Sequence, residues 1–137
     1  MKFVVKADFP YPPPELIDLP AQKTMYGGKV IAADDRIYLF ADRGSQRTGL
    51  IARGAVVHSK ALAKTAGLAR QTPRVDLTIR LDALSARLLA REQLCGFTEW
   101  SDGRPETELN FKLYRQGTNK VVGISDATAI YLDAFFK

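Results

Sequence analysis

The chain has 137 residues, of which 46% are hydrophobic and 26% are charged, and its net charge is +5. This length suits one domain with a core large enough to fold without a metal or a disulfide, so we expect a single domain over residues 1–137. The one cysteine, Cys95, excludes an intramolecular disulfide and favours a reducing cytoplasm. No apolar run is long enough for a signal peptide or a membrane span, so we expect a cytoplasmic protein with no membrane partner.

Positive charge is concentrated in the middle of the chain. Residues 36–91 contain eleven Lys or Arg against three Asp or Glu, and nine of the eleven are arginine. Arginine forms bidentate contacts with phosphate and stacks on bases. The segment therefore suggests a surface that binds a polyanion, although a solvated basic face that keeps the protein soluble would give the same pattern.

The N-terminal half indicates strands separated by turns. Five prolines between positions 10 and 20 argue against a central strand, so we expect a long ordered loop over residues 8–28. Asp34 and Asp35 interrupt the next apolar run as a tight turn, and Gly54 inside a later run suggests a bulge. The strands expected in this half cover residues 1–7, 29–42 and 48–59.

The C-terminal half mixes strands with helices. Val75, Leu77, Ile79 and Leu81 alternate with polar residues, which predicts a half-buried strand. We further expect a helix over 81–94, a loop over 96–109, strands over 109–116 and 120–125, and a final helix over 125–136 capped by Ser125 and Asp126. The predicted fold class is α+β: a small, mixed, mostly antiparallel β-barrel of about six strands flanked by two or three helices.

Few residues suggest catalysis. His58 is the only histidine, so no zinc site of the Cys/His type can form, and no G-x-S-x-G motif is present. Cys95 fits a small buried hydrophobe, and the acidic pairs lie in or near turns. We predict no catalytic residue, no metal site and no cofactor.

The segment 42–48 is a basic turn between two strands. Gly44 and Gly49 have the G-x-x-x-x-G spacing of a phosphate-binding loop, but the Lys and Ser or Thr of that motif are missing and a strand follows in place of a helix. The turn instead places Arg43 and Arg47 where they can contact a phosphate backbone without reading sequence.

The order of elements resembles the PUA-like superfamily, and in particular its EVE and YTH-type branch. That branch has an opening strand, a long loop, a "GD-x-V-x-x-Y" turn and strand, a glycine-bearing loop and a "G-x-G-x-V" strand. In this chain "AADDRIYLFAD" corresponds to the turn and strand of the family, with Asp35 in place of the aspartate. The segment "GLIARGAVV" corresponds to the later strand, with Gly54 in place of the strand glycine. The segment "FKLYRQGTNKVVGISDATAIYLDAFF" resembles the ending of the family.

The resemblance implies a module that binds nucleic acid and holds a modified base, such as a methylated one, in an aromatic pocket at the barrel mouth. Such a pocket must offset the unstacking of the base with aromatic faces, edge hydrogen bonds and phosphate contacts. The residues of this chain suited to the base pocket are Tyr26, Asp42, Trp100 and Tyr114, and those suited to the backbone are Arg43, Arg47, Arg53, Arg115 and Lys120.

Two other functions stay open at this point. The same pocket would serve a small hydrolase acting on a nucleotide or acyl substrate, and the basic face would serve a protein-interaction domain. Because EVE-type modules are often joined to a nuclease, the resemblance also makes a nuclease partner an expectation. The residues do not distinguish DNA from RNA.

Overall fold

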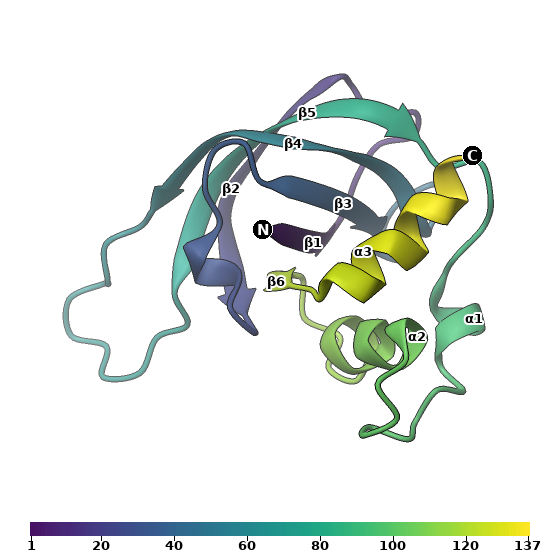
Figure 1. The fold of residues 1–137 in the computed structure, drawn as a ribbon. Helices are drawn as coiled ribbons and strands as arrows, with labels where there is room; N and C mark the ends of the chain where they lie inside the picture. Colours follow the sequence, from purple (N-terminus) through teal and green to yellow (C-terminus); the bar gives the residue numbers. More distant parts are fainter.

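Six strands form the centre of the computed structural model, which describes residues 1–137 (Figure 1). They are β1 Lys2–Ala7, β2 Leu16–Met25, β3 Arg36–Ala41, β4 Gly49–Ala61, β5 Arg74–Leu84 and β6 Lys120–Gly123. The strands close into a barrel in the order β1, β3, β4, β5, β2, β6. The pairs β1–β3 and β2–β6 are parallel and the other four pairs are antiparallel.

Helices cover one side of this barrel. They are α1 Arg91–Leu94, α2 Pro105–Leu109, its π-helical continuation η2 Asn110–Tyr114, α3 Asp126–Asp133, and the short 3₁₀ segments η1 Gly28–Val30 and η3 Ala134–Phe136. In Figure 1 the α-helices lie together, and the loop between β4 and β5 extends on the other side. The α+β class, with a mostly antiparallel barrel flanked by helices, is confirmed. None of the helices has the length and apolar character needed to span a membrane.

Two hydrophobic clusters explain the apolar runs of β1 and β3. One fills the barrel and includes Phe3 and Leu39, whereas the other lies between the barrel wall and the helices and includes Val4 and Tyr38. Consecutive residues of these strands are therefore buried on opposite faces. This burial on both faces is the reason that the two strands read as continuous apolar runs rather than as a polar and apolar alternation.

The predicted helix over residues 81–94 is wrong for most of its length. Strand β5 continues to Leu84, which pairs with Ala52 of β4, and only the four residues of α1 are helical. Just beyond the strand, Ser85 is buried and its hydroxyl donates to the Leu50 carbonyl at 2.8 Å. Pairing with β4 thus overrides the helical spacing of the leucines.

The predicted strand over residues 109–116 is also wrong, because this segment is the second half of a helix. The apolar Leu109 and Leu113 are four residues apart and both are fully buried against the barrel, which places them on one helical face. The helix begins within the predicted loop, with Pro105 at its first position. Asn110 is buried there as well, and its side-chain amide donates to the Phe97 carbonyl at 3.0 Å.

The long loop predicted over residues 8–28 contains strand β2. Pro20 lies inside this strand, where the register with β5 shifts between Leu19 and Gln22 and where Ala21 has a positive φ of 51°. The irregularity accommodates a residue that cannot donate a hydrogen bond. The bulge predicted at Gly54 is confirmed, because the register shifts there and a side chain would lie 2.1 Å from the Arg80 carbonyl oxygen. The Ser125 cap is confirmed too, since its Oγ accepts from the Thr128 amide.

Candidate functional site

A polar cavity of about 470 Å³ opens where β1 and β3 end and β4 begins, and we call it the strand-end pocket. Its floor and one wall come from these strands, and the other wall comes from α1 and the end of η2. The lining residues are Lys6, Ala41, Asp42, Arg43, Thr48, Gly49, Arg91, Glu92, Tyr114, Arg115 and Gly117. The cavity therefore contains two of the four predicted base-pocket residues, Asp42 and Tyr114, and two of the predicted backbone residues, Arg43 and Arg115.

Parallel pairing of β1 with β3 brings this set together. Ala7 pairs with Ala41, so both strands end at one edge of the barrel and Asp42 enters the loop beside Lys6. Gly49 then starts β4 with a φ of +83°, and a side chain there would lie 2.3 Å from the Leu89 carbonyl oxygen. A larger residue at this position would displace the segment that leads into α1 and would deform the pocket wall.

Two buried lysines lie side by side at the pocket, where Lys6 lines the cavity and Lys120 does not. Lys6 and Lys120 are register partners on β1 and β6, and both side chains are almost inaccessible to solvent. The Lys6 Nζ donates to the Gly117 carbonyl at 3.0 Å and lies 3.6 Å from an oxygen of Asp42. Lys120 forms no ion pair and donates only to the Gln116 carbonyl, at 2.9 Å. Buried lysines are almost always paired with a carboxylate. Because Lys120 has no such partner, this region is short of negative charge.

The pKa values of both ammonium groups are lowered at this site. Burial, together with the positive charges of Lys6 and Arg115, lowers the pKa of Lys120 to about 8. Burial also lowers the pKa of Lys6, although the attraction of Asp42 opposes this shift. An anion bound in the pocket would stabilise both ammonium groups. The site therefore has the character of an anion receptor.

Tyr114 offers a hydrogen-bond donor to the cavity. Burial raises the pKa of its phenol, as do the negative charges of Asp42 and Glu92, so the hydroxyl stays protonated at neutral pH. This hydroxyl has no hydrogen-bond partner within the chain, whereas the buried Tyr38 hydroxyl donates to Asp133 at 2.7 Å. Tyr114 and the acceptor Asp42 can thus contact the polar edge of a ligand from the same cavity.

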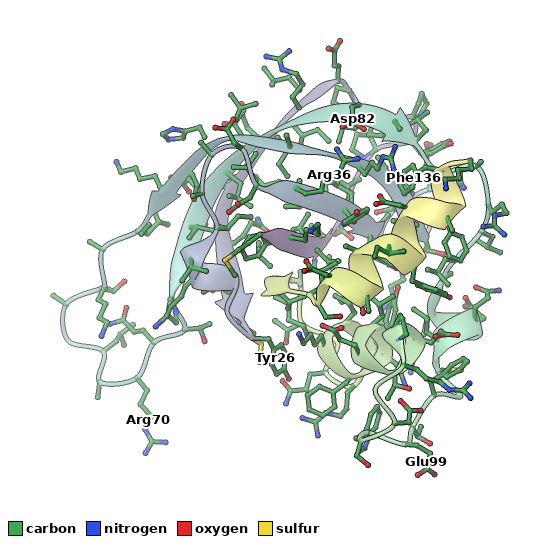
Figure 2. All side chains as sticks on the ribbon, viewed as in Figure 1. Tyr26, Arg36, Arg70, Asp82, Glu99 and Phe136 are labelled. Atoms are coloured by element: carbon green, nitrogen blue, oxygen red, sulfur yellow. The ribbon has the colours of Figure 1, made fainter.

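The other two predicted base-pocket residues, Tyr26 and Trp100, lie outside this cavity. Both contact Phe111 on the outer face of η2, with ring centroids 5.7 Å from Tyr26 and 5.3 Å from Trp100. We call these three rings the aromatic row. The Arg115 guanidinium lies over the Phe111 ring at 4.1 Å and also lines the strand-end pocket, so it joins the two features. Trp100 is 47% exposed, and Figure 2 shows Tyr26 at the end of β2, next to the helices.

The residues predicted to contact a phosphate backbone fall into two groups, those with free side chains and those whose side chains bind other residues of the chain. Arg43 and Arg115 are exposed on the pocket rim. Arg47 donates to the Tyr11 hydroxyl at 2.6 Å and to Ser85 at 3.1 Å, and Arg53 donates to Asp133 at 2.8 Å. The structure therefore brings Arg43, Arg115 and the buried Lys120 to one region, and it places Arg47 and Arg53 in contacts within the chain.

Sequence reasoning missed three residues of this region. Lys6 and the buried Val4 are two residues apart on β1 and therefore share a strand face. This spacing is the signal in the sequence that could have indicated a buried Lys6. The predicted helix over 81–94 includes Arg91 and the predicted strand over 109–116 includes Phe111, and neither local pattern reveals that η2 faces the ends of β1 and β3. Their roles depend on contacts between distant parts of the chain.

Comparison with known proteins supports the architecture. No model of a protein family matches the sequence, and no curated protein matches it. Among solved structures, the fold is similar to that of the human THYN1 protein, whose crystal structure is of a complex with DNA containing 5-methylcytosine. The two chains are 6% identical with a TM-score of 0.63, and the match covers 99% of this chain and 98% of the other. At this level of identity the likeness shows a shared fold, which is the closed six-stranded barrel flanked by helices described above.

Proposed function

We propose that residues 1–137 form one nucleic-acid-binding domain that receives a modified base in the strand-end pocket and holds the phosphate backbone on its rim. The observation that carries this proposal is the unbalanced positive charge of the pocket. Lys6, Arg43, Arg91 and Arg115 line it with two carboxylates, Asp42 and Glu92, and Lys120 lies behind it without an ion pair. Phosphate is the anion that such a surface favours in a nucleic acid.

The base itself would contact the deeper part of the pocket. A cavity of about 470 Å³ is large enough for one nucleobase. Tyr114 supplies a donor and a ring face, and Asp42 supplies an acceptor for an exocyclic amino group. Ala41 and the Tyr114 ring provide apolar surface for a methyl group. Removing a base from its stack costs a few kcal/mol, which these contacts would have to offset.

The aromatic row supports a role for neighbouring bases. Trp100, Phe111 and Tyr26 follow one another along the surface, and Arg115 connects this surface to the pocket rim. Unstacked bases bind such rings without regard to sequence. A strand that enters the pocket with one base would therefore have a stacking surface for the next.

Binding is better supported than the two alternatives. The pocket lining contains no histidine, cysteine or serine, so the Ser–His or Cys–His pair of many hydrolases is missing from it. A concave site with a buried ammonium also suits a small charged group better than a flat protein surface. For the biological setting we propose the cytoplasm and, from the family resemblance, a nuclease as the partner.

The proposal is tested by fluorescence anisotropy with matched oligonucleotides. Single-stranded and duplex DNA and RNA, each with cytosine or 5-methylcytosine, are titrated at about 50 and about 200 mM salt, because phosphate contacts make binding strongly salt-dependent. We expect Arg43→Gln to weaken all complexes alike. Tyr114→Phe loses the donor to the polar edge of the base but keeps the ring that faces the methyl group, so it should weaken binding while the preference for the modified base persists.

Tyr131→Phe is the matched control, since Tyr131 lies on α3 and does not line the pocket. It should leave both affinity and preference unchanged. Absence of binding to every oligonucleotide at low salt would refute the proposed function. Binding without any effect of the Arg43 and Tyr114 variants would remove the strand-end pocket from it.

A further inference from the structure

A second basic feature lies far from the strand-end pocket, where β4 and β5 extend beyond the barrel. We define the β4–β5 arm as residues 57–75, which include the paired ends of both strands and the loop between them. Figure 1 shows the arm extending from the barrel on the side away from α1 and α2. The Gln71 side chain organises its tip by accepting from the Thr65 amide at 2.7 Å and donating to the Thr65 carbonyl at 2.7 Å and the Leu68 carbonyl at 3.0 Å.

The arm belongs to a long segment without negative charge. Between Arg43 and Val75 the chain contains seven Lys or Arg and no Asp or Glu. Within the arm, Lys60, Lys64 and Arg70 are exposed and form no hydrogen bond or ion pair, and Figure 2 shows Arg70 pointing away from the molecule. These cations contribute nothing to internal pairing, in contrast to Arg47 and Arg53.

A hollow of about 290 Å³ at the base of the arm gathers further cations. Lys23, Lys64, Arg70 and Arg74 line it, and no carboxylate does. Lys23 and Arg74 are direct register partners on β2 and β5, and like charges in such a position destabilise a sheet. Arg74 also donates to the Ala21 carbonyl at 2.7 Å. An anion bound there would offset this repulsion.

We propose that the β4–β5 arm is a second backbone-binding element that contacts phosphates of the same nucleic acid duplex whose modified base enters the strand-end pocket. This inference rests on the proposed function. The two sites share no lining residue, and β4 connects them. Its 13 residues at about 3.3 Å each span about 40 Å. One turn of B-DNA is about 34 Å long, so the arm reaches phosphates about one turn away from the base.

The test compares duplexes of two lengths. A duplex of about 20 base pairs can contact both sites, whereas one of about 8 base pairs, roughly 27 Å long, can contact only one. The arm variant is Lys64→Gln/Arg70→Gln, and its charge-matched control is Lys29→Gln/Lys137→Gln, two exposed lysines outside the arm that form no ion pair. Lys64 and Arg70 have no partners in the chain, so we expect the melting temperature of the arm variant to be unchanged.

On the long duplex we expect the arm variant to bind about tenfold more weakly, with the slope of log K against log salt smaller in magnitude by about 2. On the short duplex, affinity should match wild type, and the preference for 5-methylcytosine should persist on both lengths. Equal affinity and slope for the arm variant and its control on the long duplex would overturn the inference while leaving the pocket proposal intact. Failure of wild type to bind any duplex would instead refute the proposed function.

Membrane binding is tested with vesicles of about 30% phosphatidylserine. If the wild-type protein binds these vesicles, the arm variant does not, and both proteins bind the long duplex equally, the inference is overturned in favour of a membrane surface.

Discussion

Arginine and lysine side chains have opposite surroundings at two places on this barrel. Beside α3, Arg36 contacts Asp82 at 2.9 Å and Arg53 contacts Asp133 at 2.8 Å, and Figure 2 shows Arg36, Asp82 and Phe136 close together there. At the strand-end pocket, Arg43, Arg115 and Lys120 form no ion pair, and Lys6 has only Asp42, at 3.6 Å. We refer to Arg36, Arg53, Asp82 and Asp133 as the paired cluster.

Under the proposed function, the contrast separates cations that hold the fold together from cations that bind the ligand. In the paired cluster the carboxylates come from β5 and from α3, so the charges hold elements of the fold together. At the strand-end pocket the chain leaves positive charge without such partners, and burial adds a free-energy cost that folding alone does not explain. Charges of the first kind should affect stability when changed, and charges of the second kind should affect binding.

The largest expected effect is on stability. Asp133→Ala removes one partner of Arg53 and one of the Tyr38 hydroxyl, whose pKa burial and Asp133 raise to about 12. We expect the free energy of unfolding to fall by about 2 kcal/mol, because Tyr38 keeps only the Ala129 carbonyl, at 3.3 Å, and Arg53 keeps only Asp82, at 3.4 Å. Urea denaturation measures the change. A loss below about 0.5 kcal/mol would show that the paired cluster is not structural.

Next in size is a loss of binding without loss of stability. Arg43→Gln/Arg115→Gln should weaken oligonucleotide binding by about 10- to 30-fold, about 1.4 to 2 kcal/mol, because two phosphate contacts disappear. The midpoint of urea denaturation should stay within error of wild type. Arg53→Gln is the counterpart from the paired cluster and should show the reverse pattern. Equal losses of stability in the Arg43→Gln/Arg115→Gln and Arg53→Gln variants would contradict the proposed contrast between the strand-end pocket and the paired cluster.

Lys120 should affect both stability and binding, and both effects should depend on pH. Lys120→Met removes a buried ammonium, and at pH 7 we expect it to raise the free energy of unfolding by about 1 to 2 kcal/mol. The folded pKa of about 8 lies below the ordinary lysine pKa of 10.5, so the cost of the charged form is complete below pH 8 and disappears as pH approaches 10.5. The advantage of the variant should shrink over that range in denaturation series measured at several pH values.

Binding should move in the opposite direction for the same variant. Loss of the Lys120 charge is expected to weaken oligonucleotide binding a few-fold at pH 7, and wild-type affinity should decline as pH rises past 8, more steeply than that of the variant. A Lys120→Met protein that is less stable at pH 7 and binds normally would contradict the assignment of Lys120 to anion binding.

The smallest expected effect concerns the aromatic row. Trp100→Ala removes an exposed ring and should weaken single-stranded binding about fivefold, about 1 kcal/mol, while the preference for a modified base stays the same. Competition assays with single strands of equal length measure it. A larger loss for duplex than for single strands would argue that the row contacts the backbone rather than unstacked bases.

Parts of the molecule whose structure depends on local pattern could be predicted from the sequence. The alternation around Val75 and Leu77 identified β5, and Ser125 marked the start of α3, because a cap and a strand face are properties of a few neighbouring residues. The leucines between 81 and 94 and the alternation after Leu109 led to wrong elements, because each pattern is compatible with both a helix and a strand. Packing against β4 and against the barrel wall decided between them.

Sequence pattern was enough to predict the α+β barrel, the concentration of arginine in the middle of the chain and the carboxylate-free run that includes the β4–β5 arm. Tertiary contacts determine which of those cations are free. Arg53 and Asp133 are 80 residues apart, and Lys6 and Asn119 are 113 apart. Whether a charge is neutralised depends on groups within a few ångströms of it, and the closure of the barrel selects those groups.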